Sequence, residues 1–176
     1  QHRGEFSDLT QSFNHMSAEL EQKQRVEQLF SRFVSDPVAA RYMAQDNVEL
    51  AREGKRVDAS ILFVDLVGYT AFSEGRHPEE TAEVLNLYFT EFAKTCHEFH
   101  GNVDKYIGDC AMLVFGCPQS DPEHRYHAME CALQIRDRIN ELNRIRTQNQ
   151  EPCLNIRIGV SGGTVLAGLL GSHERM

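Results

Sequence analysis

The strongest constraint on the fold is the order in which the apolar pattern switches between the period of a strand and that of a helix. Residues 59–64 are a mostly apolar, β-forming run, which predicts a buried strand ending at Asp65. A loop at Gly75 follows, and Pro78 is well suited to the first turn of a helix. The inner face predicted for that helix consists of Ala82, Leu85, Phe89, Phe92 and Cys96. A strand followed by an amphipathic helix is therefore the first unit of the fold.

Three further elements follow in an order that defines a fold class. Two short strands at 102–107 and 110–115 flank Gly108-Asp109, and these residue types in a two-residue connection indicate a hairpin. A long helix then carries its apolar residues on one side, namely Ala128, Ala132, Ile135, Ile139 and Leu142. Residues 154–160 alternate between apolar and polar, as in a strand with one buried face. The order predicts an α+β domain with the ferredoxin-like βαββαβ plan, which is a split βαβ arrangement.

Composition and charge exclude several classes of protein. With 41% apolar and 25% charged residues, the chain can bury a core. Its net charge of −8 argues against a nucleic-acid surface, which would carry clustered Lys and Arg. No apolar run approaches the ~20 residues of a membrane helix, and no signal peptide is visible. The five cysteines lack zinc-site spacing, so we expect reduced thiols and a cytoplasmic location.

The first part of the chain has a different pattern from the rest. Leu9, Phe13, Met16 and Leu20 are spaced like the seam of a two-stranded coiled coil, and the seam changes phase before Val26. Such a seam fits dimerisation, and it fits equally one amphipathic helix docking on its own domain. We therefore divide the chain into a helical segment at 1–27, a coupling segment at 28–55 and a globular domain at 56–176.

Two acidic residues at the ends of predicted elements are candidates for a metal site. Asp65 follows the first strand and Asp109 lies in the hairpin turn. Two carboxylates that meet at sheet ends can hold Mg²⁺ or Mn²⁺, and two such ions can activate an attacking oxygen and stabilise a leaving one. The turn after Asp65 can direct backbone N–H groups toward an anion. Spacing alone does not decide the matter, because an isolated Asp after a strand is usually a turn or cap residue.

Four motifs resemble the class III adenylate and guanylate cyclases, in that family's order. Residues 63–70 (FVDLVGYT) resemble the first metal-binding motif, and residues 103–109 (VDKYIGD) resemble the second. Residues 156–168 are similar to the strand and turn that follow the long helix, and residues 171–176 to the next segment. The resemblance covers roughly residues 56–176 and implies a cyclase catalytic domain with that family's α+β core.

The resemblance also implies roles for individual residues. Asp65 and Asp109 would hold two divalent ions, Mg²⁺ or Mn²⁺, with the backbone carbonyl of Leu66 as an added ligand. The amides that would hold the β- and γ-phosphates of ATP are those of Val67, Gly68, Tyr69 and Thr70. Lys105 matches the purine-reading position and can donate to adenine N1, whereas guanine presents a donor there. Arg157 matches a phosphate-contacting position. Without the resemblance, Lys105 would be a solvated strand lysine and Arg157 one half of a surface ion pair.

The implied activity is conversion of ATP to 3′,5′-cyclic AMP and pyrophosphate by attack of the ribose 3′-hydroxyl on the α-phosphate. In this family a homodimer shares its sites, with the aspartates from one subunit and Lys105 from its partner. The family pattern continues past Met176 with a second purine-reading residue and a transition-state Asn and Arg. A protein ending at Met176 is therefore expected to be inactive or nearly so. Residues 4–16 resemble the second helix of a HAMP domain, which implies regulation through the N-terminal helices and an upstream membrane tether.

Other functions remain open at this point. A guanylate cyclase has the same motifs, and a non-catalytic dimerisation and signal-relay module could retain the fold. A diguanylate cyclase shares the βαββαβ plan, but its Gly-Gly-Asp/Glu-Glu-Phe hairpin is absent. The pairs His97/His100 and His124/His127 could bind a metal, but we predict solvated histidines because no Cys or acidic partner completes a set.

Overall fold

The computed structural model describes residues 54–168 of the chain. Its elements, in chain order, are β1 (Lys55–Val67), α4 (Tyr69–Ser73), α5 (Pro78–Glu98), β2 (Asn102–Ile107), β3 (Cys110–Phe115), α6 (His124–Gln148) and β4 (Asn155–Ala167). The predictions for residues 1–27, for all but the end of 28–55 and for 171–176 lie outside the described residues. No helix between residues 54 and 168 combines the length and the apolar character that crossing a membrane requires.

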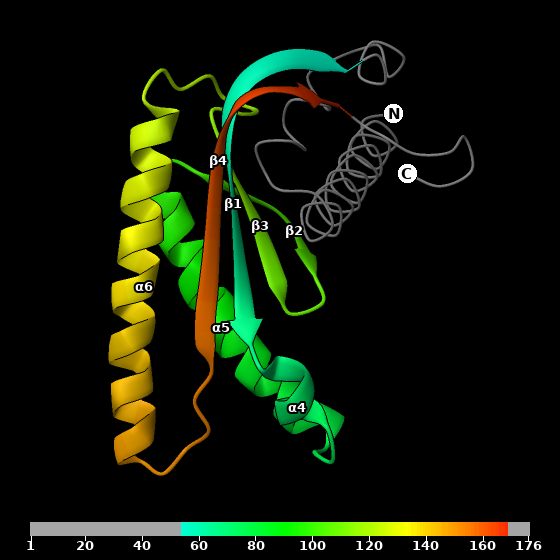
Figure 1. Ribbon diagram of the computed structural model, residues 1–176, viewed down its shortest axis with the longest axis vertical. Helices are drawn as coiled ribbons and strands as arrows, with labels where there is room; N and C mark the ends of the chain where they lie inside the picture. Colours follow the sequence, from blue (N-terminus) through cyan, green and yellow to red (C-terminus); the bar gives the residue numbers. More distant parts are fainter. Residues whose placement is uncertain (1–53, 169–176) are drawn as a thin grey trace, which may run out of the picture.

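The four strands form one antiparallel sheet in the order β2-β3-β1-β4. The helices α5 and α6 lie against the sheet, and Figure 1 shows them together on one of its faces. This arrangement confirms the predicted α+β class and its ferredoxin-like order. β1 occupies the centre of the sheet because it pairs with β3 on one side and with β4 on the other.

The core lies between the sheet and the two long helices. In β1, Leu62, Val64 and Leu66 are buried, whereas Phe63 and Asp65 between them are directed to the opposite face. No helix between residues 54 and 168 covers that face, which we call the uncovered face. The other fully buried large side chains of the core include Tyr88, Phe92, Leu113, Phe115, Ile135 and Ile139. The alternation of side chains along the strand therefore decides which residues enter the core and which lie on the opposite face, where a ligand could contact them.

The buried face of α5 differs in part from the predicted one. Phe89, Phe92 and Cys96 are buried as predicted, but Ala82 is exposed, so its assignment to the inner face was wrong. Thr81, Tyr88 and Thr95 are buried instead. The polar atoms of these residues are bonded; the Thr95 hydroxyl, for example, donates to the Glu91 carbonyl at 2.7 Å. A pattern that counts only apolar residues therefore misses them.

The strands β1 and β4 are longer than predicted and extend past the rest of the sheet. β3 ends opposite Ser60, whereas the β1–β4 pairing continues to Lys55 and Ala167. These extensions form a two-stranded arm that curves away from the sheet in Figure 1. The turn that the resemblance implied within residues 156–168 was therefore wrong, because residues 161–167 continue as strand and pair with residues 55–61 of β1.

Polar contacts tie the base of this arm to the start of α6. The Ser60 hydroxyl lies 2.8 Å from His124 Nδ1, and Arg125 donates two hydrogen bonds of 2.9 Å to the Asp58 carboxylate. His124 is buried, so the prediction of a solvated histidine was wrong at this position. The reason is that Ser60, from a strand 64 residues earlier, supplies the partner that burial requires.

Candidate active site

β1 delivers Asp65 to the uncovered face of the sheet. In the strand pairing, Asp65 lies opposite Cys110 of β3 on one side and opposite Arg157 of β4 on the other. Residues paired in this way share a face, so Cys110, Asp65 and Arg157 form one row across three strands. Asp65 is half-buried and Arg157 is exposed. The row therefore places a carboxylate beside a guanidinium cation on the uncovered face of the sheet.

The β2–β3 turn brings Asp109 to the end of β1. The Leu66 N–H donates to the Asp109 carbonyl at 3.3 Å, and Gly108 adopts φ 62° in this turn, a conformation that glycine allows without strain. The pKa of the Cys110 thiol is raised, first by burial and then by the negative charges of Asp65 and Asp109. Asp109 directly precedes Cys110, which pairs with Asp65, so the two aspartates lie at the same end of the sheet.

A turn and a short helix follow β1 at this end of the sheet. Gly68 has φ 80° and ψ 11° and precedes α4 as its N-cap, and the Phe72 N–H donates to the Gly68 carbonyl at 2.9 Å. The first N–H groups of a helix have no acceptor within that helix. They include the amides of Tyr69 and Thr70, two of the four predicted phosphate contacts. The sequence predicted the turn but not the helix, which has only five residues.

Lys105 lies on the same face as Asp65 but two strands away. It pairs with Met112 of β3, beyond an irregularity of β2 at Asp104, and its ammonium lies 3.1 Å from the Asp104 carboxylate. Strands are spaced by about 4.8 Å, so β1 and β2 are about 10 Å apart. Lys105 therefore does not join the row formed by Cys110, Asp65 and Arg157.

Apolar side chains surround these charges on the uncovered face. Phe63 is 44% exposed, Val67 39% and Ile107 53%. Single exposed apolar residues are ordinary, whereas several together around a charged row form a patch of the kind found at interaction surfaces.

Comparison with known proteins decides the family. The model of the adenylate and guanylate cyclase catalytic domain matches residues 53–176. The chain belongs to this family. An uncharacterized protein of Mycobacterium tuberculosis is 33% identical over 97% of the chain, which spans 30% of that relative's length. Adenylate cyclase 1 of Rhizobium meliloti is 30% identical over 71% of the chain and 19% of that protein. The solved guanylyl cyclase Cya2 superposes with a TM-score of 0.63 at 34% identity, over 69% of this chain and 62% of that one.

The donor atoms in this cyclase domain suit hard divalent cations. Asp65 and Asp109 are half-buried carboxylates that lie close enough to influence the same thiol. Mg²⁺ and Mn²⁺ prefer such oxygen ligands, and the Leu66 carbonyl is of the same type. Among residues 54–168, no group of three or more His, Cys, Asp and Glu side chains is arranged to hold a metal ion. Of the second histidine pair, His127 bonds to Asp121 at 2.7 Å.

Three features of the site escaped the sequence analysis. Cys110 follows Asp109 and pairs with Asp65, α4 begins directly after Gly68, and Leu154 before β4 is bonded to both long helices. The Gly-Asp-Cys order was visible, but the face to which Cys110 points follows only from the β1–β3 pairing.

Proposed function

We propose that this cyclase domain belongs to an adenylate cyclase that converts ATP into 3′,5′-cyclic AMP and pyrophosphate. The main support is the β1–β3 pairing, in which Asp65 lies opposite Cys110 and the adjacent Leu66 N–H bonds to the Asp109 carbonyl. A second support is the 30% identity to a protein named adenylate cyclase 1.

In this proposal the residues at the end of β1 bind and orient the triphosphate. Asp65, Asp109 and the Leu66 carbonyl hold two divalent ions, which supply charge neutralisation and activation of the ribose 3′-hydroxyl when bound. The backbone amides of residues 67–70 hold the β- and γ-phosphates. Arg157, directly opposite Asp65, contacts a phosphate oxygen and keeps the departing pyrophosphate in place. The protein contributes mainly position and charge, as in phosphoryl transfer generally.

Lys105 selects the purine in this proposal. Its ammonium is exposed and can donate to adenine N1, which accepts, whereas guanine N1 carries a hydrogen. We expect Lys105→Glu to lower cyclic AMP formation by at least about tenfold and to raise the share of cyclic GMP. Competition between ATP and GTP measured by product chromatography tests this. An unchanged ratio of the two products contradicts the role of Lys105.

The complete site requires two subunits in this proposal. Lys105 lies about two strand spacings from the row that contains Asp65, and the uncovered face exposes Phe63, Val67 and Ile107. We propose that a second copy covers this face and brings its Lys105 to the other subunit's aspartates. Mixing Asp65→Ala protein with Lys105→Ala protein should restore part of the activity in heterodimers. Absence of any restored activity contradicts the shared site.

The decisive test uses the two aspartates in the protein as its gene encodes it. We expect Asp65→Asn and Asp109→Asn each to weaken Mn²⁺ binding by about tenfold or more, equivalent to roughly 1.4 kcal/mol, and to abolish turnover of MnATP. Mn²⁺ binding is followed by electron paramagnetic resonance, and turnover by cyclic AMP formation. Asp137→Asn is the control, because it removes the same charge from the exposed side of α6. Retained turnover in Asp65→Asn contradicts the metal role.

A guanylate cyclase is the second candidate, because the solved structure with 34% identity is a guanylyl cyclase. Cyclic GMP as the main product of the unsubstituted protein would favour it. Failure to convert either nucleotide, together with undetectable Mn²⁺ binding, would favour a non-catalytic dimerisation and signal-relay module.

We also propose that residues 1–55 carry a signal into this domain from an upstream membrane tether, with residues 1–27 as a HAMP-like helix. The support is the heptad-like spacing of these residues and the length of the relatives, of which the chain spans 30%. Recovery of the encoded protein in the soluble fraction of a cell lysate contradicts the tether.

A further inference from the structure

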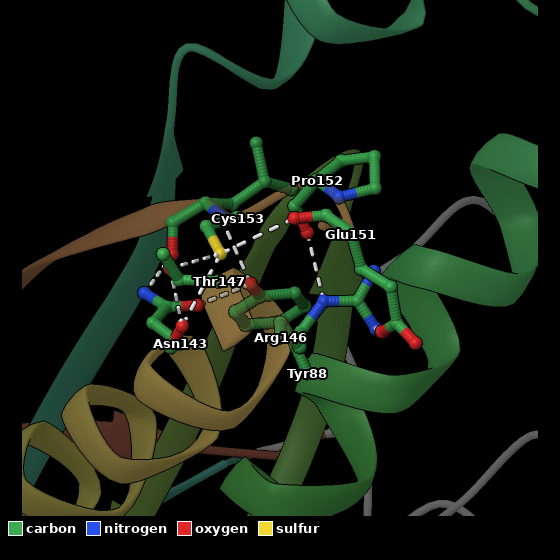
Figure 2. Close-up of polar contacts among 8 residues, drawn as sticks. Tyr88, Asn143, Arg146, Thr147, Glu151, Pro152 and Cys153 are labelled. Atoms are coloured by element: carbon green, nitrogen blue, oxygen red, sulfur yellow. Dashed lines mark hydrogen bonds and ion pairs between the residues drawn. The ribbon is translucent and has the colours of Figure 1, made fainter. Parts of the chain in front are cut away.

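The residue that precedes β4 is held by side chains from both long helices. The Leu154 N–H donates to the Tyr88 hydroxyl of α5 at 2.9 Å, and the Leu154 carbonyl accepts from Asn143 Nδ2 of α6 at 2.8 Å. The Tyr88 hydroxyl in turn donates to Asn143 Oδ1 at 2.6 Å. Figure 2 shows Tyr88 and Asn143 meeting beneath the α6–β4 turn. We call Tyr88, Asn143 and Leu154 the β4 clamp.

The hydrogen bonds of the β4 clamp lie in the buried interior of the domain. Tyr88 is fully buried and Leu154 almost so. Burial is the main cause that raises the pKa of Tyr88, so its hydroxyl stays protonated and can donate to Asn143 while accepting from Leu154. A buried backbone N–H without a partner is costly, so loss of the Tyr88 hydroxyl leaves Leu154 no equivalent bond.

Other contacts support the turn but attach it only to α6. Arg146 Nε donates to the Pro152 carbonyl at 2.7 Å, and the Glu151 N–H donates to the Arg146 carbonyl at 2.9 Å (Figure 2). Tyr88 differs from these because it comes from α5 and joins that helix to α6 and to the start of β4.

The position of Leu154 bears directly on the candidate site. β4 begins at the next residue, where Asn155 pairs with Val67, and two residues later Arg157 pairs with Asp65. A slip of one residue in this pairing moves every β4 side chain to the opposite face of the sheet, which would turn Arg157 toward the core. The end of β4 that carries Arg157 is thus the end that the β4 clamp holds.

We propose that Tyr88 and Asn143 are positioning residues for the nucleotide site, because they hold Leu154 so that β4 presents Arg157 beside Asp65. The proposal rests on the proposed function in so far as Arg157 contacts a phosphate of the nucleotide. Neither residue touches the substrate, and both act through the register of β4.

The first test measures the position of β4 without any substrate. Hydrogen exchange is followed for the amides of residues 154–157 in Tyr88→Phe, with Asn143→Ala as a second variant should the first not fold. We expect exchange there to be faster by about tenfold or more, because these amides then open locally. Thr95→Val is the matched control, since it also removes a buried hydroxyl from α5 without changing side-chain shape. Unchanged protection at 154–157, or an equal loss in Thr95→Val, overturns the proposal.

The second test asks whether Tyr88 acts through Arg157. In the encoded protein, Tyr88→Phe should raise KM for MnATP by about three- to tenfold with a smaller change in kcat, and should have less than about a twofold effect in an Arg157→Ala background. Equal effects in both backgrounds overturn the coupling. If the unsubstituted protein converts neither ATP nor GTP, the proposed function has failed, and the exchange result alone then supports or overturns the positioning of β4.

Discussion

Gly101 lies between α5 and β2 in a space that admits no side chain. A Cβ atom at this position would lie 2.5 Å from Phe115 Cε1, 2.6 Å from Cys96 Sγ and 2.7 Å from Phe115 Cζ. Phe115 and Cys96 are fully buried, so neither can move aside into solvent. Overpacking a core in this way costs about 1–3 kcal/mol, and three contacts this short place Gly101→Ala near 2 kcal/mol or above. At roughly 2–4 °C per kcal/mol for a chain of this size, Tm should fall by about 4–8 °C.

Thermal unfolding followed by circular dichroism measures this effect. Gly163→Ala is the control, because a Cβ there has no other atom within 4 Å, and we expect its free energy of unfolding to change by less than about 0.5 kcal/mol. Adding Phe115→Leu to Gly101→Ala removes the edge of the aromatic ring with which the new methyl group clashes. The double variant should therefore lose less stability than the sum of the single changes. If Gly101→Ala has the same Tm as Gly163→Ala, the packing argument is refuted.

Three other predictions concern the core and the arm. Leu113 is fully buried, so Leu113→Ala should lower the free energy of unfolding in urea by about 2–5 kcal/mol. Burial raises the pKa of Cys131 to about 12 and that of Cys96 higher still, so a thiol reagent at pH 8 should label these two only after unfolding, as peptide mapping would show. The hydrogen bonds from Arg125 lower the pKa of Asp58 below its ordinary 3.8. The Asp58 charge therefore stabilises the fold above that pH, and the difference in stability between the unsubstituted protein and Asp58→Asn should shrink as the pH falls below 3.8.

Elements whose burial follows from local spacing were predicted well. The apolar face of α6 recurs every three or four residues, and Ala128, Ala132, Ile135 and Ile139 are buried as predicted. The hairpin strands match the predicted bounds because two turn residues separate two apolar runs. The exposed Ala82 was placed wrongly because the position of α5 on the sheet, and not its own period, selects the buried face.

The sequence by itself determined the order of the elements, the two aspartates at strand ends and the family motifs around them. Only the tertiary structure decided that Asp65 lies between Cys110 and Arg157, that Ser60 reaches His124 and that Tyr88 holds Leu154. The physical reason is that helix and strand periodicity and turn formation depend on residues that are close together in the sequence. Strand register joins residues up to 112 positions apart, as in the pair Lys55 and Ala167, and the buried hydrogen bond between Leu154 and Tyr88 joins residues 66 positions apart. Both exist only once the sheet and helices have packed.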